Sequence, residues 1–261
     1  MPSKALGQNF LIDPNVARAI VRDAGVMPGE RVIEIGAGFG SLTLALAAAG
    51  AEVIAVEFDR GVVPALREVA AEAPGVRVVQ ADAMRLDWNA VLGAGADPWT
   101  LCANLPYNIA APLVLDVLQG VARVRRMAVM VQREVGERLV ARPGDEAYGA
   151  VSVRVAYRAS ASLVRRVGRD VFWPRPKVDS VVVRVDRLAE PAVAVDETRL
   201  WRVVEGAFAQ RRKTMRNAVR RLGLDAVDAD AVLAVAGVDP RSRPEELSLQ
   251  DFARVASALP A

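Results

Sequence analysis

The sequence contains no histidine and only one cysteine among its 261 residues. The absence of histidine excludes Ser-His-Asp and Cys-His catalysis and metal sites with histidine ligands, and we expect no bound metal. The single cysteine, Cys102, cannot form a disulfide within the chain, which is typical of a reducing compartment. Because Cys102 lies in an apolar run, we expect it to be a small buried side chain rather than a nucleophile.

The sequence also lacks a long hydrophobic run and a recognisable leader. No uninterrupted apolar stretch approaches the ~18 residues that a membrane-spanning helix needs. The first residues, Met1-Pro2-Ser3-Lys4, do not begin a charged and then apolar signal pattern. Hydrophobic residues nevertheless make up 52% of the chain, which is enough for a large core and argues against disorder. We therefore expect a soluble, cytoplasmic protein without membrane contact. We also expect it to be a monomer.

The net charge of +3 hides an uneven distribution of charge along the chain. Residues 1–120 carry 8 Lys/Arg and 13 Asp/Glu, residues 121–221 carry 23 and 11, and residues 222–261 carry 3 and 7. A basic block of this kind is typical of polyanion binding, although solvated faces rich in arginine give the same composition. Because the excess is confined to one region, we favour a polyanionic partner.

A strand, a glycine-rich loop and a helix are predicted in succession between residues 31 and 49. Arg31 to Ile35 is short and β-branched, and it opens into Gly36-Ala37-Gly38-Phe39-Gly40. The glycines allow the backbone to approach a ligand closely, and the following helix N-terminus favours an anion or carboxylate. The spacing lacks the two-residue gap before the third glycine of the dinucleotide fingerprint, which argues against a pyrophosphate ligand.

Two acidic residues follow the next two predicted strands. Glu57 ends the strand at residues 52–57, where a carboxylate can accept hydrogen bonds from ribose hydroxyls. Asp82 follows the strand at residues 76–80 and can meet an adenine amine. A surface carboxylate at a strand end is the alternative for each. With the glycine loop, they predict a doubly wound α/β sheet that binds an adenosine without pyrophosphate, and S-adenosylmethionine fits this description.

The segment Asn104-Leu105-Pro106-Tyr107 follows a fourth short apolar run, Trp99 to Ala103. Pro106 cannot donate to a strand ladder, so the strand should end here, at the edge where open α/β sheets bind their ligands. An amide can both accept and donate hydrogen bonds, and an aromatic ring can stack on a nucleobase. The segment therefore predicts a site for the exocyclic amine of a base, facing the methyl group of the cofactor. A plain strand-end turn is the alternative.

The region between residues 148 and 185 is predicted to complete the sheet. Tyr148 to Ala161 alternates apolar and polar residues, which predicts a strand, and Val181 to Val185 is predicted as its hairpin partner and the last of seven strands. The prolines between residues 171 and 180 predict a rigid loop. In this loop we expect Phe172 to face the site and Trp173 to be the hydrophobic plug, or both to be a plug if no base binds here.

The C-terminal part is predicted to be helical, with a linker at residues 188–195 and helices near residues 198–208, 213–222, 229–236 and 249–259, the last capped by Ser248. Several cations lie within about three turns in this part, and one more lies in the proline-rich loop. We interpret them as a phosphate-binding surface for RNA. They are Arg211, Arg212, Lys213, Arg216, Arg220, Arg221 and Lys177.

Taken together, these motifs resemble the KsgA/RsmA family of bacterial 16S rRNA adenine dimethyltransferases. The resemblance covers the whole chain, and the combination is far more specific than any one motif. One departure is Ala37, where many members carry proline. The matching segments are Leu6-Gly7-Gln8-Asn9-Phe10-Leu11, Glu34 to Thr43, Val56-Glu57, Asn104 to Pro112, Ala147-Tyr148-Gly149, Phe172 to Ser180, and Gln210-Arg211-Arg212-Lys213-Thr214.

The resemblance implies a Rossmann-like class I methyltransferase domain at residues 1–187, with a seven-stranded sheet, and a small helical rRNA-binding domain at residues 198–261. It implies dimethylation at N6 of two adjacent adenosines in a 3′-terminal hairpin loop of 16S rRNA within an immature small subunit. The cofactor would be S-adenosylmethionine and the product S-adenosylhomocysteine. From the strand-end segment and the aromatic loop, we predict Asn104, Leu105, Pro106, Tyr107 and Phe172 as the catalytic residues. The cofactor contacts are Asn9, Leu11, Gly36, Glu57, Asp82 and Asn104, together with Gly38 from the glycine loop.

Two other functions remain open from the sequence. A related methyltransferase type, which modifies 23S rRNA and confers macrolide resistance, shares the fold and much of the Asn104 segment. A non-catalytic ribosome assembly factor would keep the fold without the chemistry. The residues Asn104 and Tyr107 and the acidic cofactor positions favour an enzyme, and the loop from Pro174 to Ser180 favours the small-subunit family.

Overall fold

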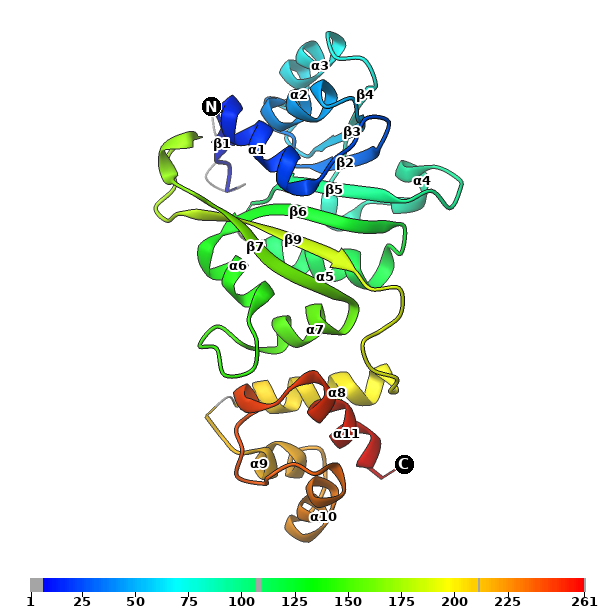
Figure 1. Cartoon of the computed structure of the whole chain (residues 1–261), viewed down its shortest axis with the longest axis vertical. Coiled ribbons are helices and arrows are strands. Elements are labelled where there is room, and N and C mark those ends of the chain that lie inside the picture. Colours follow the sequence, from blue (N-terminus) through cyan, green and yellow to red (C-terminus); the bar gives the residue numbers. More distant parts are fainter. Residues whose placement is uncertain (1–6, 107–108, 211, 261) are drawn as a thin grey trace. The chain divides into compact units, whose positions relative to one another are not determined.

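The structure is a computed structural model that describes residues 7–106, 109–210 and 212–260. The chain divides into two compact units, each of which is discontinuous in sequence (Figure 1). The first unit comprises Met1–Glu137 and Ser160–Arg187, and the second comprises Arg138–Ala159 and Leu188–Ala261. The expected domain boundary differs from this division, because residues 138–159 pack with the C-terminal helices.

A seven-stranded sheet forms the centre of the first unit, with the strand order β4-β3-β2-β5-β6-β9-β7. The pairs β3–β4, β2–β3, β2–β5 and β5–β6 are parallel, and β6–β9 is antiparallel. The chain changes direction across the sheet between β2 and β5, which is where open α/β sheets bind ligands. The strands are β2 (Arg31–Ile35), β3 (Glu52–Glu57), β4 (Val76–Gln80), β5 (Trp99–Asn104), β6 (Val124–Gln132), β7 (Ala159–Val167) and β9 (Ser180–Arg187).

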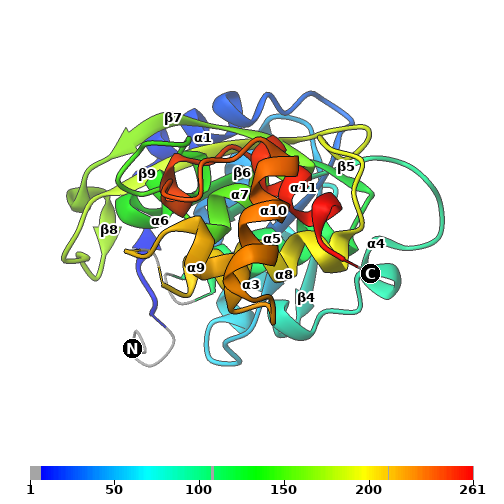
Figure 2. The same cartoon turned by 90° about the horizontal axis from the view of Figure 1, so that it is seen from below.

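Helices cover both faces of this sheet (Figures 1 and 2). Helix α1 is built as its sequence predicts: Asp13 accepts a hydrogen bond from the Asn15 N–H at 2.7 Å, and Gly25 ends the helix in the left-handed conformation. Residues of α1 and α2 share one buried cluster with strand residues, and α5 packs on the opposite face. The helices of this unit are α1 (Pro14–Ala24), α2 (Ser41–Ala48), α3 (Val63–Ala71), α4 (Trp88–Leu92), α5 (Ala110–Gly120) and the start of α6 (Arg133–Val140).

A second, two-stranded sheet joins the N-terminal segment to the proline-rich loop. Strand β1 (Phe10–Leu11) pairs antiparallel with β8 (Phe172–Trp173), with Phe10 opposite Trp173 and Leu11 opposite Phe172. The Ile12 N–H extends the pairing by donating to the Val171 carbonyl at 2.9 Å. The N-terminal segment is therefore fixed beside residues that lie far along the chain.

The strand predicted at residues 148–161 is wrong over most of its length. The structure has helix α7 (Ala150–Arg158) there, and strand β7 begins only at Ala159. Tertiary packing overrides the strand preference of the alternating β-branched residues. A helix places Val153 and Tyr157 one turn apart, and both are buried in the core of the second unit. The prediction of seven strands in the main sheet is confirmed, since β7 takes the place of the misassigned strand.

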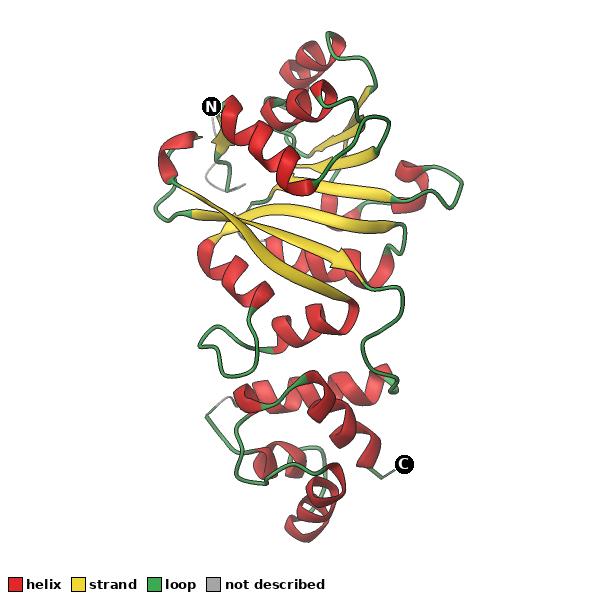
Figure 3. Ribbon diagram, in the orientation of Figure 1, coloured by secondary structure: helices red, strands yellow, loops and turns green. Residues whose placement is uncertain are grey.

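The second unit is helical and has its own core (Figure 3). Phe252 is fully buried in this core, and the rings of Trp201 and Tyr157 pack edge to face with centroids 5.1 Å apart. Ser248 caps the last helix as predicted, accepting a hydrogen bond from the Asp251 N–H. Besides α7, its helices are α8 (Glu197–Phe208), α9 (Met215–Arg220), α10 (Ala226–Ala236) and α11 (Leu249–Ala258).

Candidate active site at the carboxyl ends of the central strands

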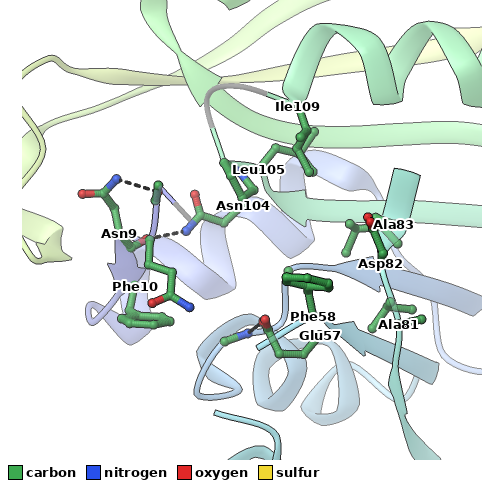
Figure 4. A pocket seen from close by; sticks show the side chains of 17 residues that line it. Asn9, Phe10, Glu57, Phe58, Ala81, Asp82, Ala83, Asn104, Leu105 and Ile109 are labelled. Carbon is green, nitrogen blue, oxygen red and sulfur yellow. Dashed lines mark hydrogen bonds between the residues drawn. The ribbon is translucent and has the colours of Figure 1, made fainter. Parts of the chain in front are cut away.

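A pocket opens in the first unit where strands β2, β3, β4 and β5 end (Figure 4). The glycine loop, the residues after β3 and β4, the Asn104 segment and the N-terminal segment all contribute to its walls. Most of the predicted cofactor and catalytic residues therefore meet around one cavity. Those lining it are Asn9, Gly36, Gly38, Glu57, Asp82, Asn104, Leu105 and Pro106.

The glycine loop and Glu57 hold each other in place. The two oxygens of the Glu57 carboxylate accept hydrogen bonds from the Gly38 N–H and the Asp59 N–H, both at 2.8 Å. Gly38 has φ +56°, and a Cβ atom there would lie 2.8 Å from the Phe10 ring, so only glycine fits. Each carboxylate oxygen keeps a further lone pair, so Glu57 can still accept a hydrogen bond from a ribose hydroxyl.

Asp82 faces the same pocket from the end of β4. One of its oxygens accepts a hydrogen bond from the Met84 N–H at 2.9 Å, which starts the short 3-10 turn at Ala83–Arg85. The turn fixes the backbone of Asp82 and leaves its second oxygen available for a donor. Asp82 thus lies at the pocket wall with one oxygen able to accept a hydrogen bond.

The side chain of Asn104 has a defined orientation. Its amide nitrogen donates a hydrogen bond to the Asn9 carbonyl at 2.9 Å, and a carbonyl oxygen can only accept. The amide nitrogen must therefore face the N-terminal segment, which leaves the side-chain oxygen of Asn104 as the available acceptor. Leu105 is buried, and the Pro106 carbonyl accepts from the Ile109 N–H at 3.2 Å. Tyr107, the predicted stacking residue, lies outside the described residues.

Leu11 does not line the main pocket. Its side chain is buried in the cluster beneath α1, and it borders a small hollow beside the glycine loop. The same hollow is bordered by Glu34, a residue for which no function was predicted from the sequence. The signal in the sequence that could have identified Glu34 was a charged residue between two isoleucines of the predicted strand Arg31–Ile35.

Glu34 is a buried carboxyl group beside the pocket. Its exposed fraction is 1%, and one oxygen accepts a hydrogen bond from the Thr43 hydroxyl at 2.5 Å. Burial raises the pKa of Glu34 to about 8, and the negative charge of Glu57 contributes in the same direction. Glu34 therefore changes its charge near neutral pH. Cys102 is fully buried, as predicted, and burial raises the pKa of its thiol.

The aromatic pair in the proline-rich loop is placed the opposite way from the prediction. Phe172 is 4% exposed and belongs to the buried cluster with Leu11, whereas Trp173 is 51% exposed. Successive residues of a strand point to opposite sides, so pairing with β1 puts one ring inside and the other outside. The Trp173 ring stacks on Phe10, with centroids 6.5 Å apart and planes at 25°, and Phe10 lines the pocket. Of this pair, Trp173 is therefore the exposed aromatic, and it lies next to a residue of the pocket wall.

In the second unit, part of the predicted phosphate-binding set surrounds an open hollow. Lys213, Arg220 and Arg221 line it together with the amides of Gln210 and Asn217. Cations and amide donors around one hollow suit a phosphate group. Arg212 is exposed, Lys177 is exposed in the first unit, and Arg211 lies outside the described residues.

Other arginines of the basic block are committed to contacts within the chain. Arg216, a member of the predicted set, forms a two-pronged ion pair with Asp230 at 2.6 and 2.8 Å. Arg165 pairs with Asp23, and Arg126 pairs with Glu30. Their charges are therefore largely balanced, and the basic block is less available to a polyanion than its composition suggests.

Within the described ranges, no cluster of three or more histidine, cysteine, aspartate or glutamate side chains is arranged to hold a metal ion. In the same part of the chain, no helix has both the length and the apolar character needed to cross a membrane.

A family model described as "Ribosomal RNA adenine dimethylase" matches residues 3–260. "Ribosomal RNA small subunit methyltransferase A" of Thermobifida fusca is 47% identical over 264 residues, covering 99% of this chain and 91% of that protein. The protein of the same name from Moorella thermoacetica is 44% identical over 267 residues, covering 99% and 93%.

Two solved structures share the fold over almost the whole chain. The 23S rRNA methyltransferase ErmE has a TM-score of 0.73 at 26% identity, covering 96% of this chain and 99% of its own. A dimethyladenosine transferase from Plasmodium falciparum has a TM-score of 0.78 at 23% identity, covering 94% and 95%. These findings confirm the predicted class I methyltransferase fold with a helical C-terminal part, and an adenine dimethyltransferase that depends on S-adenosylmethionine. The chain belongs to the ribosomal RNA adenine dimethylase family.

Proposed function

We propose that the protein dimethylates N6 of two adjacent adenosines in a 3′-terminal hairpin loop of 16S rRNA, within an immature small ribosomal subunit. The small subunit is proposed as the substrate because the chain is 44–47% identical, over nearly its full length, to proteins named small subunit methyltransferase A. We further propose that it acts in the cytoplasm as a monomer and releases S-adenosylhomocysteine.

The pocket fits S-adenosylmethionine on its own geometry. The glycine loop lines the pocket at Gly36 and Gly38, where a Cβ atom at Gly38 would clash with the Phe10 ring. Glu57 can accept a hydrogen bond from the ribose, and Asp82 can accept one from the adenine amine. When bound, the cofactor supplies an electrophilic methyl group. Asn9 and Gly36 are proposed as further contacts from the pocket wall, and Leu11 from beneath it.

The proposed chemistry depends on the acceptor oxygen of Asn104. The lone pair of an adenine N6 is delocalised into the ring, so the amine is a poor nucleophile until its geometry changes. A hydrogen bond from an N6 proton to the Asn104 side-chain oxygen would hold the amine in line and localise its lone pair. The Asn9 carbonyl keeps that oxygen available by binding the amide nitrogen. As the N6–methyl bond forms, the bond from the methyl group to sulfur breaks, and the methylated nitrogen becomes acidic and can then lose its proton to water. No strong base is needed before the transfer, in agreement with a chain that has no histidine.

The target base must leave its stack before it can reach Asn104, at a cost of a few kcal/mol. Stacking on an aromatic ring returns about 1–3 kcal/mol per base. Tyr107 stays the proposed partner of the target base. Since Phe172 is buried, we assign the second aromatic contact to Trp173, which is exposed and stacked on a residue of the pocket wall.

We expect the hollow in the second unit to hold the rRNA backbone. Replacing Lys213, Arg220 and Arg221 together by alanine should weaken binding to small subunits and reduce the slope of log affinity against log salt by about 2–3, because each lost phosphate contact removes about 0.7–0.9. The measurement is a binding titration at several salt concentrations. The Arg216→Ala/Asp230→Ala pair is the matched control, since it removes a balanced ion pair and should leave the slope unchanged. An unchanged slope in the triple variant would place the RNA elsewhere.

The function is tested by methyl transfer from labelled S-adenosylmethionine to under-methylated small subunits, with large subunits in parallel. We expect N6,N6-dimethyladenosine in 16S rRNA alone. Label in the large-subunit rRNA would contradict this proposal and favour the 23S rRNA methyltransferase alternative. No transfer to either subunit, with cofactor still bound, would contradict both.

A further inference from the structure

Residues 7–12 form a segment, here called the N-terminal strap, that connects three parts of the first unit. At one end, the Gln8 amide nitrogen donates to the Asp59 carboxylate at 2.7 Å, just after β3. In the middle, the Asn9 carbonyl accepts from Asn104 at the end of β5. At the other end, Ile12 continues the pairing with β8. The strap therefore contacts both the cofactor side and the base side of the proposed site.

The strap also lies directly against the glycine loop. The Phe10 ring occupies the space that a side chain at Gly38 would need, and it packs on Phe39 with centroids 4.6 Å apart. Gly7, Gln8, Asn9 and Phe10 all line the main pocket. Figure 4 shows Asn9 and Phe10 beside Asn104 and across the pocket from Asp82. A displacement of the strap would therefore change the shape of the pocket and the surroundings of Asn104 together.

The Gln8–Asp59 hydrogen bond attaches the strap to the residues that follow β3. Asp59 is held from three directions: one oxygen accepts from Gln8, the other accepts from the Gly61 N–H at 2.8 Å, and its own N–H donates to Glu57. The hydrogen bonds from Gln8 and Gly61 hold the pKa of Asp59 below its usual value, so Asp59 is an ionised acceptor. An ionised acceptor makes this attachment stronger than a neutral amide pair.

We propose that Gln8 is a positioning residue for methyl transfer: its hydrogen bond to Asp59 holds the strap so that the Asn9 carbonyl fixes the Asn104 amide with its oxygen toward the pocket. Without that carbonyl, the amide can turn over and present its nitrogen to the adenine amine. Two donors would then face each other, and the base would lose its alignment. This inference rests on the proposed role of Asn104.

The test is a set of variants at Gln8 and Asp59. Gln8→Glu places a second carboxylate against Asp59, and we expect kcat to fall at least tenfold and the dissociation constant of S-adenosylmethionine to rise several-fold. In Gln8→Glu/Asp59→Asn, the amide introduced at position 59 can donate to the carboxylate introduced at position 8, so kcat and cofactor affinity should return to the values of Asp59→Asn alone. Gln119→Glu makes the same chemical change at an exposed position of α5 and should match the unchanged protein.

Thermal unfolding separates positioning from a purely structural role. We expect the midpoint of Gln8→Glu to stay within a few degrees of the unchanged protein, while its kcat at saturating cofactor falls. The inference is overturned if Gln8→Glu keeps its kcat, or if the double variant is as slow as Gln8→Glu. If the unchanged protein labels no subunit, the proposed function fails. In that case the role of the Gln8–Asp59 hydrogen bond is still tested by cofactor binding, which does not require RNA. The dissociation constant of S-adenosylmethionine should rise in Gln8→Glu and recover in the double variant.

Discussion

Replacing Asn104 by alanine should lower the rate of methyl transfer by about 10²–10³, the loss seen when one preorganised hydrogen-bonding group is removed from an active site. The alanine variant loses the acceptor that aligns the adenine amine and also the hydrogen bond to the Asn9 carbonyl. Single-turnover transfer to under-methylated small subunits measures the effect on chemistry. Calorimetric titration with S-adenosylmethionine measures how much of it comes from cofactor binding.

Asn104→Asp tests the role of orientation separately. A carboxylate has no donor for the Asn9 carbonyl, so the side chain cannot keep the arrangement that the amide has. We expect this variant to be nearly as slow as Asn104→Ala although it retains an acceptor oxygen. Asn89→Ala, at an exposed position on α4, serves as the control. A rate for Asn104→Ala within threefold of the control would refute the proposed role.

Replacing Glu34 by glutamine should remove a large pH dependence of stability. The folded protein raises the pKa of Glu34 from 4.5 to about 8, so between these values the folded state binds more protons than the unfolded state. The contribution of Glu34 protonation to the free energy of unfolding is fully present below pH 4.5 and is lost as the pH rises toward 8. Since each pKa unit corresponds to about 1.4 kcal/mol, the free energy of unfolding should fall by a few kcal/mol across this window.

Glutamine at position 34 can still accept the Thr43 hydroxyl but cannot ionise, so the variant should be the more stable protein above pH 8. Urea unfolding at pH 5.5, 7 and 8.5 measures the difference. Glu72→Gln, at an exposed position at the end of α3, is the matched control and should keep the pH dependence of the unchanged protein. If Glu34→Gln retains the full slope, another group is responsible for it.

Much of the first unit could be predicted because its signals are local. The Asp13-Pro14 start and the Gly25 end of α1 depend on caps that neighbouring residues provide. The glycine loop needs φ values that only glycine adopts readily, and Pro106 ends a strand because it has no N–H. With parallel strands on either side, these signals were sufficient to predict one pocket containing Glu57, Asp82 and Asn104.

The errors occur where two local patterns were equally compatible with the residues. Residues 150–158 alternate like a strand, but Val153 and Tyr157 are also one helical turn apart, and the core available in the second unit selects the helix. Phe172 and Trp173 must point to opposite sides, yet which of them is buried depends on the pairing of β8 with β1. The sequence of the segment alone does not determine whether residues 150–158 form a helix or a strand, or which of the two aromatic side chains is buried.

The sequence by itself therefore determined the order of most strands and helices, the family, and the set of residues around the pocket. Only the tertiary structure decided how those residues are paired. In the folded protein, the Asn9 carbonyl of the N-terminal strap orients the Asn104 amide. Burial raises the pKa of Glu34 to about 8, and Asp230 forms an ion pair with Arg216. Caps, glycines and prolines act within a few residues, whereas hydrogen bonds, burial and ion pairs depend on groups that only folding brings together.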